Sequence, residues 1–272
     1  MIREHAPAKI NLALHLRRRR DDGYHDLESI FAFTEFGDAL SGEPADELAL
    51  ALSGPMAAAA DVGNDNLVLR AARALAAAAG TTAGARLHLE KHIPVAAGLG
   101  GGSADAAAAL RLLNRLWRLN WPLDRLAAVA APLGADVPVC VHGRTLLGNG
   151  KGDALSPWPQ DPADTPVLLV NPGVAVPTGP VFAGWDQHDR GGIASGAAFT
   201  ALRNDMTASA VAIAPVIADV LAALEQAGGA DLVRMSGSGA TCLALYGTPE
   251  ARDRAALALA GRGWWLCPTR IV

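Results

Sequence analysis

The chain contains few of the residues that mark secreted or membrane proteins. Its 272 residues include three cysteines, Cys140, Cys242 and Cys267, and these form no C-x-x-C pair. An odd number of isolated cysteines argues against a disulfide framework and favours a reduced, cytoplasmic compartment. Apolar residues never run for the about 18 positions that a membrane-spanning helix needs, and polar residues interrupt the N-terminus before a signal peptide could form. We therefore expect a soluble, cytoplasmic protein without a membrane partner.

Positive charge is also scarce. The formal net charge is −4, and charged residues make up 18% of the sequence. This balance argues against a general nucleic-acid binder, which would need a basic surface. The basic run at residues 17–20 is followed directly by Asp21 and Asp22. It therefore indicates a solvated strand end or turn rather than an anion-binding patch.

The histidines do not indicate a metal site. His88 and His92 are four residues apart, a spacing that would pair two imidazoles on one helix face. The surrounding segment RLHLEKHIP alternates apolar and polar residues, however, and it stops at Pro94, so it is typical of a strand. At about 3.3 Å per residue, the two rings would be roughly 13 Å apart, too far to share a metal ion.

Strands and helices are mixed along the chain, which indicates an α+β protein. We expect strands at residues 8–16, 27–33, 47–52 and 86–93 and in the segments PVLLVNPG and TCLALY. Helices are expected at 66–79, capped by Asn64 or Asp65 and closed by Gly80, and at 104–119, 123–132, 211–226 and 249–260. Residues 133–153 should form strand and turn. Four prolines within residues 157–166 indicate a linker, so we expect one domain at 1–155 and another at 156–272.

The segment PVAAGLGGGSAD, residues 94–105, places four glycines within five positions. Glycine loses much backbone freedom on folding, so such a cluster indicates that something approaches the backbone closely. A strand, a glycine-rich turn and a helix N-terminus form a recurrent anion site, because free amides and the positive end of the helix dipole point at one spot. The patterns GxxxxGK[ST] and GxGxxG do not fit. The alternative is a flexible turn with Ser103 as helix cap.

Asp105 follows the glycine loop at the start of the expected helix. A carboxylate there would normally repel a phosphate, but it could hold Mg²⁺ or cap free backbone amides. We expect a cap.

Three separated motifs resemble the GHMP kinases, the family of galactose, homoserine, mevalonate and phosphomevalonate kinases. The glycine loop fits the family pattern P-x-x-x-G-L-G-x-x-S, and it is preceded by PAKINLALHL and followed by MSGSGATCLALY. The resemblance covers nearly the whole chain. It implies an α+β, two-domain GHMP kinase fold with the active site in the cleft between the domains, and it implies ATP and Mg²⁺ as cofactors. Ala104 and Asp105 stand where serine and asparagine are common in the family, which puts a second phosphate-binding hydroxyl in doubt.

Further segments are similar to one branch of that family. These are DGYHDLESIFAF, GADVPVCVHG and PGVAVPTGPVF. The similarity implies phosphorylation of the 2-hydroxyl of a small-molecule substrate, a cytidine diphosphate-linked methylerythritol, in the non-mevalonate isoprenoid pathway. A GHMP kinase acting on homoserine or mevalonate and an inactive nucleotide sensor are the alternatives. The sequence does not specify the oligomeric state or the protein ligands of Mg²⁺.

Two residues carry the catalytic roles that the resemblance implies. Asp136 would be the general base, and Lys9 would orient it and favour its charged form. Lys9 shares a strand face with Asn11, opposite an Ile-Leu-Leu-Leu face, so this polar face could line a cleft. The alternatives are a solvated outer face for Lys9 and a turn start before Pro138 for Asp136.

The resemblance also places the substrate and ATP contacts. The substrate residues would be Asn11, Tyr24, His25, Phe31, Thr178 and Phe182. The ATP residues would be Asn66 and Lys91 near adenine, and Pro94, Gly98, Leu99, Gly100, Gly101, Gly102 and Ser103 around the phosphates. Stacking on a cytosine ring contributes about 1–3 kcal/mol per base in nucleic-acid binders, and His25 would read the edge of the base. Phe31 could equally be core, Thr178 a helix cap and Lys91 a solvated edge residue.

Overall fold

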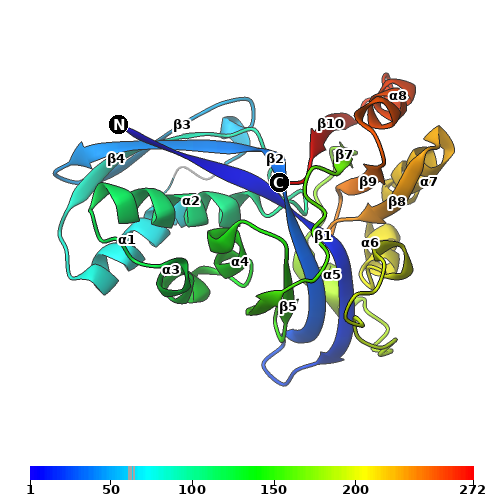
Figure 1. Ribbon diagram of the computed structural model, residues 1–272, viewed down its shortest axis with the longest axis horizontal. Helices are drawn as coiled ribbons and strands as arrows, with labels where there is room; N and C mark the ends of the chain where they lie inside the picture. Colours follow the sequence, from blue (N-terminus) through cyan, green and yellow to red (C-terminus); the bar gives the residue numbers. More distant parts are fainter. Residues whose placement is uncertain (61–62, 64) are drawn as a thin grey trace. The chain divides into compact units, whose positions relative to one another are not determined.

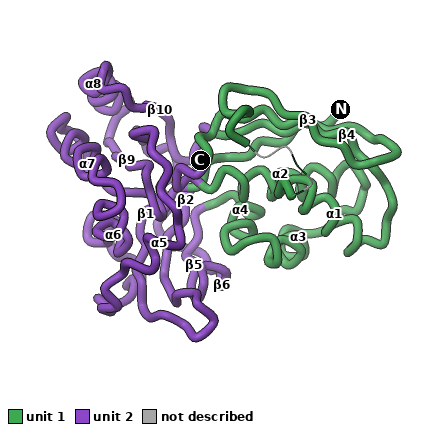
Figure 2. Tube along the Cα trace, turned by 180° about the vertical axis from the view of Figure 1, so that it is seen from behind, with its two compact units in different colours: residues 1–9, 37–95, 100–144 green, residues 10–36, 96–99, 145–272 purple. Residues whose placement is uncertain are grey.

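The computed structural model describes residues 1–60, 63 and 65–272. The chain forms two compact units that interleave in the sequence (Figure 2). Unit 1 contains Met1–Lys9, Gly37–Val95 and Gly100–Arg144, and unit 2 contains Ile10–Phe36, Ala96–Leu99 and Thr145–Val272. The strands β1 (Ile2–Arg19) and β2 (His25–Ala45) therefore run through both units. The predicted domains, 1–155 and 156–272, are each one continuous segment, whereas the two compact units each consist of three segments. The predicted boundary between functional domains stays a prediction.

Unit 1 packs its helices on one face of its strands (Figure 1). Strand β4 (Gly84–Glu90) pairs antiparallel with β2 and parallel with β3 (Leu48–Ser53). The helices are α1 (Leu67–Ala79), α2 (Gly101–Leu116), α3 (Leu123–Ala130) and α4 (Val137–His142), with short 3₁₀ turns at Ala57–Ala59 and Ala131–Leu133. Alternate residues of β4, such as Leu87 and Leu89, are buried, as expected for a strand covered on one face.

Unit 2 contains a four-stranded sheet in the order β10-β7-β9-β8. Its strands are β7 (Pro166–Asn171), β8 (Ala230–Met235), β9 (Cys242–Tyr246) and β10 (Trp265–Arg270), and a hairpin of β5 (Leu146–Asn149) and β6 (Ala154–Pro157) pairs with β2. The helices are α5 (Thr178–Ala183), α6 (Thr207–Ile213), α7 (Val216–Ala227) and α8 (Pro249–Leu259), with a 3₁₀ turn at Phe199–Ala201. Apolar residues of β7 and α7, including Leu168, Val220 and Leu224, form much of the core.

Several predicted elements differ from the observed ones. Residues 134–143 were expected in strand and turn, but they contain helix α4, which packs on α2 and α3. The predicted helix at 211–226 is interrupted at residues 214–215, because α6 ends at Ile213 and α7 begins at Val216 after Pro215. The cap of α1 is Asn66 rather than Asp65, and Asn64 lies outside the described residues. Gly80 closes α1 in the left-handed conformation, which confirms the predicted end.

Among the described residues, no helix is both long enough and apolar enough to span a membrane. The three cysteines are buried, and each is a free thiol.

Candidate active site

Lys9 and Asp136, the predicted catalytic pair, meet within unit 1. The Nζ atom of Lys9 lies 2.9 Å from Oδ2 of Asp136. Lys9 comes from β1 and Asp136 is the residue before α4, where its side chain makes no cap hydrogen bond with the described part of the helix. The Lys9 side chain is 5% exposed and that of Asp136 is 36% exposed. The solvated alternative for Lys9 is therefore wrong, and the carboxylate keeps one side open to an incoming group.

The glycine loop passes close to this pair at Gly100. A Cβ atom at Gly100 would lie 3.1 Å from Cε of Lys9, and the φ angle of 63° is in the left-handed region. Both features favour glycine at this position. The loop backbone at Gly100 therefore lies directly beside the Lys9 side chain within unit 1.

The first part of the loop packs against the second glycine-rich segment, in unit 2. Gly98 has a φ angle of 77°, and a Cβ there would lie 2.6 Å from the carbonyl oxygen of Ser236 and 2.7 Å from that of Gly239. The hydroxyl of Ser236 donates to the carbonyl of Gly98 at 3.0 Å. The glycine at position 98 is therefore required by backbone-to-backbone contact, and the segment 236–240 supports the loop.

Helix α2 begins inside the glycine loop. It starts at Gly101, earlier than the predicted residue 104, and its cap residue is Gly100, which has no side chain to bond the first amides. Ser103 lies in the first turn and is not the N-cap, so the alternative of a simple Ser103-capped turn is wrong. An uncapped helix N-terminus can bind an anion such as phosphate.

The structure excludes the solvated alternative for Lys91 and the predicted capping role of Asp105. Lys91 is 4% exposed and lies at the end of β4, which is a central strand between β3 and β2, so it is not a solvated edge residue. Its ammonium donates to Asp105 at 2.6 Å and also bonds Asp38. Asp105 therefore belongs to a buried ionic cluster, and the prediction that it caps the helix was wrong.

Two predicted substrate residues, His25 and Phe182, stack in unit 2. Their ring centroids are 5.1 Å apart with an interplanar angle of 29°. Burial, with a smaller effect from Arg19, lowers the pKa of His25, so the imidazole is neutral at pH 7. Tyr24 is 56% exposed, and the ammonium of Lys151 lies 4.8 Å from its ring centroid. The structure thus brings a neutral imidazole against Phe182, whereas the ring of Tyr24 is exposed and lies beside Lys151.

Trp185 is a residue of this aromatic cluster that the sequence did not reveal. Its ring meets His25 edge-on at 5.7 Å and 75°, and it is 5% exposed. Its indole Nε1 is buried without a hydrogen-bond partner among the described residues. A tryptophan next to a polar segment was the available signal, since large aromatic residues rarely stand in solvent without a packing role.

The segment that follows Trp185 is tied to β1 and β2. Arg17 bridges Glu28 at 2.5 Å and Asp189 at 2.9 Å, and the amide of Ile193 donates to Glu28 at 2.6 Å. No sequence pattern indicates a role for residues 185–196. In the structure these contacts anchor the chain next to the His25 cluster.

The remaining predicted substrate residues have internal partners. Asn11 is buried, donates to Ser29 at 2.7 Å, and its backbone amide donates to the Ser236 hydroxyl at 3.2 Å. Thr178 shares a 3.0 Å hydrogen bond with Ser238 and makes no cap for α5. Phe31 is 2% exposed, which agrees with the core alternative; its substrate contact stays a prediction.

The predicted ATP residues outside the glycines have simple structural roles as well. The side chain of Asn66 accepts from the amide of Val68 at 2.9 Å and so caps α1, whereas Pro94 is half-buried at the start of the loop. Leu99 is buried, and a Cβ at Gly102 would lie 3.3 Å from the end of the Leu67 side chain. The ATP contacts of these residues stay predictions.

The described residues contain no group of three or more His, Cys, Asp or Glu side chains arranged to hold a metal ion. Mg²⁺ in kinases commonly takes only one or two carboxylates together with substrate phosphates and water. We therefore assign no protein ligand to Mg²⁺.

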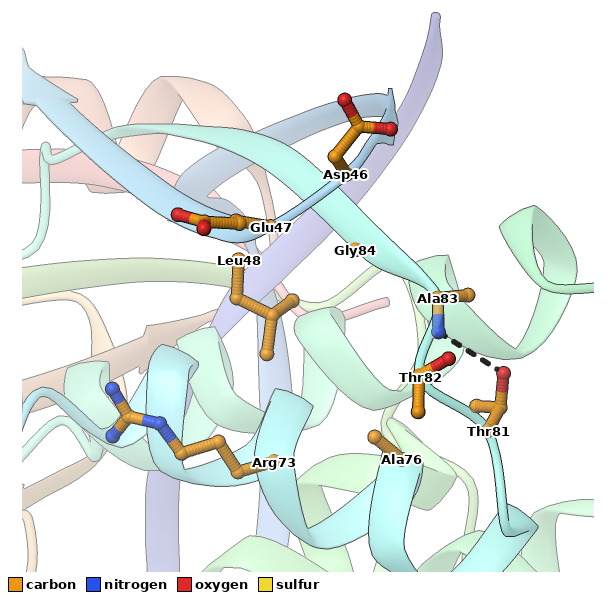
Figure 3. Close-up of a pocket in the computed structure, with 9 residues that line it drawn as sticks. All are labelled: Asp46, Glu47, Leu48, Arg73, Ala76, Thr81, Thr82, Ala83 and Gly84. Atoms are coloured by element: carbon orange, nitrogen blue, oxygen red, sulfur yellow. Dashed lines mark hydrogen bonds between the residues drawn. The ribbon is translucent and has the colours of Figure 1, made fainter.

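A surface pocket of about 330 Å³ lies elsewhere in unit 1 (Figure 3). It is lined by the β2–β3 turn, the end of α1 and the start of β4, including Asp46, Arg73 and Thr82. None of the predicted ATP or substrate residues lines it, so it plays no part in the site described above.

Two family models match this chain. The model of the GHMP kinases N terminal domain matches residues 66–144, and that of the GHMP kinases C terminal matches residues 187–263. The first includes the glycine loop and Asp136, and the second includes the segment 236–240. The predicted fold class is confirmed, whereas the placement of the active site between two domains stays a prediction.

Curated relatives are similar over nearly the whole chain. The 4-diphosphocytidyl-2-C-methyl-D-erythritol kinase of Rhizorhabdus wittichii is 52% identical over 276 residues, covering 98% of this chain and 94% of that protein. The protein of the same name from Novosphingobium aromaticivorans is 51% identical and covers 97% and 90%.

Solved structures show the same fold. A crystal structure of 4-(cytidine 5'-diphospho)-2C-methyl-D-erythritol kinase superposes with a TM-score of 0.85 at 35% identity, over 99% of both chains. The homoserine kinase of Cytophaga hutchinsonii has a TM-score of 0.74 at 18% identity, covering 99% of this chain and 94% of that one. At that identity the second likeness concerns the fold alone.

Proposed function

Because this chain belongs to the 4-diphosphocytidyl-2-C-methyl-D-erythritol kinases, a branch of the GHMP kinase family, we propose that it phosphorylates the 2-hydroxyl of 4-diphosphocytidyl-2-C-methyl-D-erythritol. The products would be the 2-phosphate and ADP, and the reaction would serve the non-mevalonate isoprenoid pathway. ATP is the phosphate donor of the family. We also propose a cytoplasmic location.

The observation that carries the proposal is the 2.9 Å pair of Lys9 and Asp136 beside Gly100. Phosphoryl transfer needs alignment, neutralisation of the transferring group and a base near the attacking hydroxyl. In our proposal the half-exposed carboxylate of Asp136 accepts the proton of the 2-hydroxyl. The buried ammonium of Lys9, 2.9 Å away, fixes the orientation of that carboxylate.

The glycine loop would bind the ATP phosphates through its backbone. Amides at the start of α2 point out of an uncapped helix end, and the helix dipole adds partial positive charge there. Mg²⁺ would arrive with the phosphates and neutralise their charge when bound. The left-handed φ angles of Gly98 and Gly100, 77° and 63°, let the loop backbone curl, which supports this role.

The aromatic residues would bind the cytosine. The exposed ring of Tyr24 and the half-buried ring of Phe182 offer stacking surfaces, and stacking contributes about 1–3 kcal/mol per base in nucleic-acid binders. A neutral His25 can both donate and accept one hydrogen bond at the edge of the base. Homoserine and mevalonate carry no ring that these residues could stack on.

The test is an ADP-release assay with Mg·ATP. The diphosphocytidyl-methylerythritol substrate is offered beside homoserine, mevalonate and galactose, and Asp136→Asn serves as the control. We expect turnover with the cytidylyl substrate alone, reduced about 10²–10⁴-fold in the variant because general base catalysis contributes that much.

Other outcomes would change the proposal in distinct ways. Turnover with a different alcohol would keep the kinase mechanism and overturn the substrate. ATP binding without turnover on any alcohol would favour a nucleotide sensor. Near-normal turnover of Asp136→Asn would remove Asp136 from the role of base.

A further inference from the structure

Three buried charged side chains meet next to the glycine loop in unit 1. Lys91 lies directly after β4, Asp38 lies on β2, and Asp105 lies just after the first turn of α2. The ammonium of Lys91 bonds both carboxylates. The exposed fractions of the three side chains are 5%, 0% and 5%. No part of the proposed chemistry uses them directly.

The cluster is bonded to the backbone before the glycine loop and to a side chain of the helix that follows it. The Oδ1 atom of Asp38 accepts from the amides of His92, at 2.5 Å, and Ile93, at 2.8 Å, in the segment that leads into the loop. On the other side, the Nζ atom of Lys91 lies 3.5 Å from the position of a Cβ atom at Gly101, the first residue of α2. One lysine thus ties the entry of the loop to the helix that leaves it.

The charges of this cluster do not balance if all three groups are ionised. Two carboxylates share one ammonium, and Oδ1 of Asp105 is buried without a hydrogen-bond partner in the described chain. A buried ionised oxygen without a partner is costly, and protonation removes the cost. Burial first, opposed by Lys91 and supported by Asp38, raises the pKa of Asp105 to about 8.

We propose that Lys91, Asp38 and Asp105 act as positioning residues that hold the glycine loop in its phosphate-binding conformation, with Asp105 kept as a neutral carboxylic acid. In this state the cluster carries no net negative charge beside the phosphates. Lys91 then supports ATP binding through the loop backbone, and its ammonium does not touch the nucleotide. The inference rests on the proposed role of the loop in binding ATP phosphates.

Ionisation of Asp105 would weaken this arrangement. Among the described residues, Lys91 from the end of β4 and Asp38 from β2 act directly on Asp105, and Cys140 from α4 is near enough to be affected by its charge. Burial raises the pKa of Cys140 to about 12, so this thiol adds no charge. Loss of the Asp105 proton therefore leaves one uncompensated negative charge next to the phosphate loop, and ATP affinity falls.

The experiment measures the dissociation constant of a non-hydrolysable ATP analogue, without any alcohol substrate, from about pH 6 to about pH 9, a range that spans the proposed titration. The wild-type protein is compared with Asp105→Asn, which keeps the size and removes the titration. We expect wild-type affinity to fall as pH rises through about 8, while the variant binds equally across that step. Titration of ATP itself is common to both proteins and cancels.

Lys91→Met provides a second test of the proposal. It leaves both carboxylates without their cation, so we expect ATP affinity to fall at least about tenfold. The affinity for the cytidylyl substrate should stay as in the wild type, which a general loss of structure would not allow. Parallel pH profiles of the wild type and Asp105→Asn would overturn the role of Asp105, and equal losses for both ligands in Lys91→Met would overturn the positioning role. If the protein phosphorylates a different alcohol, the ATP-analogue affinities of the wild type and both variants still test this inference.

Discussion

The ammonium of Lys9 lies 2.9 Å from Oδ2 of Asp136, with the lysine buried and the aspartate half-exposed. This asymmetry matters because a buried cation is less screened by solvent than an exposed one. Lys9 therefore holds the carboxylate in one orientation while the exposed side of Asp136 stays free to meet a hydroxyl. The two side chains form one catalytic unit in our proposal.

A double-mutant cycle tests that unit. Lys9→Met and Asp136→Asn should each lower kcat by about 10²-fold or more, because each removes either the base or its orientation. Residues that act together are strongly non-additive, so the double variant should be about as slow as the slower single variant. The measurement is kcat for the three variants and the wild type. Multiplied losses in the double variant would mean that the two residues act independently.

Gly98 and Gly102 form a matched pair for testing the glycine loop. Gly98→Ala places a methyl group 2.6 Å from a backbone carbonyl and strains a φ angle of 77°, so the loop must move. Gly102→Ala meets only the end of the Leu67 side chain, at 3.3 Å. We expect KM for ATP to rise at least about tenfold in the first variant and less in the second, a free-energy difference of roughly 1.4 kcal/mol.

Equal KM values for ATP in Gly98→Ala and Gly102→Ala would show that the close packing at Gly98 is not needed for nucleotide binding. Melting temperatures of both variants serve as the control for folding.

Trp185 should control recognition of the cytidine end through His25. Trp185→Leu removes the edge-on contact, so the imidazole loses its fixed position and KM for the cytidylyl substrate rises, while KM for ATP stays the same. Trp185→Phe keeps an aromatic edge and should restore part of the affinity. Steady-state kinetics with both substrates measures the two KM values separately.

Trp158→Leu is the control for that prediction. Trp158 is also buried in unit 2 and its indole nitrogen also lacks a partner among the described residues, so its loss costs comparable packing. A rise of the cytidylyl KM in this variant as large as in Trp185→Leu would point to a general effect of destabilisation.

Sequence patterns predicted the secondary-structure elements that depend mainly on neighbouring residues in the chain. The strand before the glycine loop, the loop itself and the closing Gly80 all follow from alternation or from glycine geometry. Helix α4 was missed because residues 137–141 contain three valines and a proline, which have low helix propensity. Its contacts with α2 and α3 override that propensity. The break at Pro215 was a local signal that the helix assignment did not use.

The candidate site also contains some features that sequence motifs predict and others that they do not. The family motifs pointed to Lys9 and Asp136, and the structure brings these two together. The cluster of Lys91, Asp38 and Asp105 could not be predicted, because Asp38 comes from a distant strand and no motif connects it to the loop. Taken alone, Asp105 looked like a helix cap, and only its burial beside Lys91 excludes that interpretation.

The pH dependence of stability offers an independent test of the protonated Asp105. Its pKa is raised from 3.8 to about 8 in the folded protein, so between these values the native state keeps a proton that the unfolded chain has released. The contribution of Asp105 to the free energy of unfolding is therefore fully present below about pH 4 and is lost as pH rises through about 8. Asp105→Asn cannot titrate and lacks this dependence.

We expect the difference in the free energy of unfolding between wild type and Asp105→Asn to change in favour of the variant by on the order of a few kcal/mol across that range. Urea denaturation of both proteins at matched pH values measures it, and subtraction removes the titration of all other groups. A constant difference from about pH 4 to about pH 8 would mean that Asp105 is ionised throughout and that Lys91 neutralises only part of the cluster. The glycine loop would then bind phosphates next to a permanent negative charge.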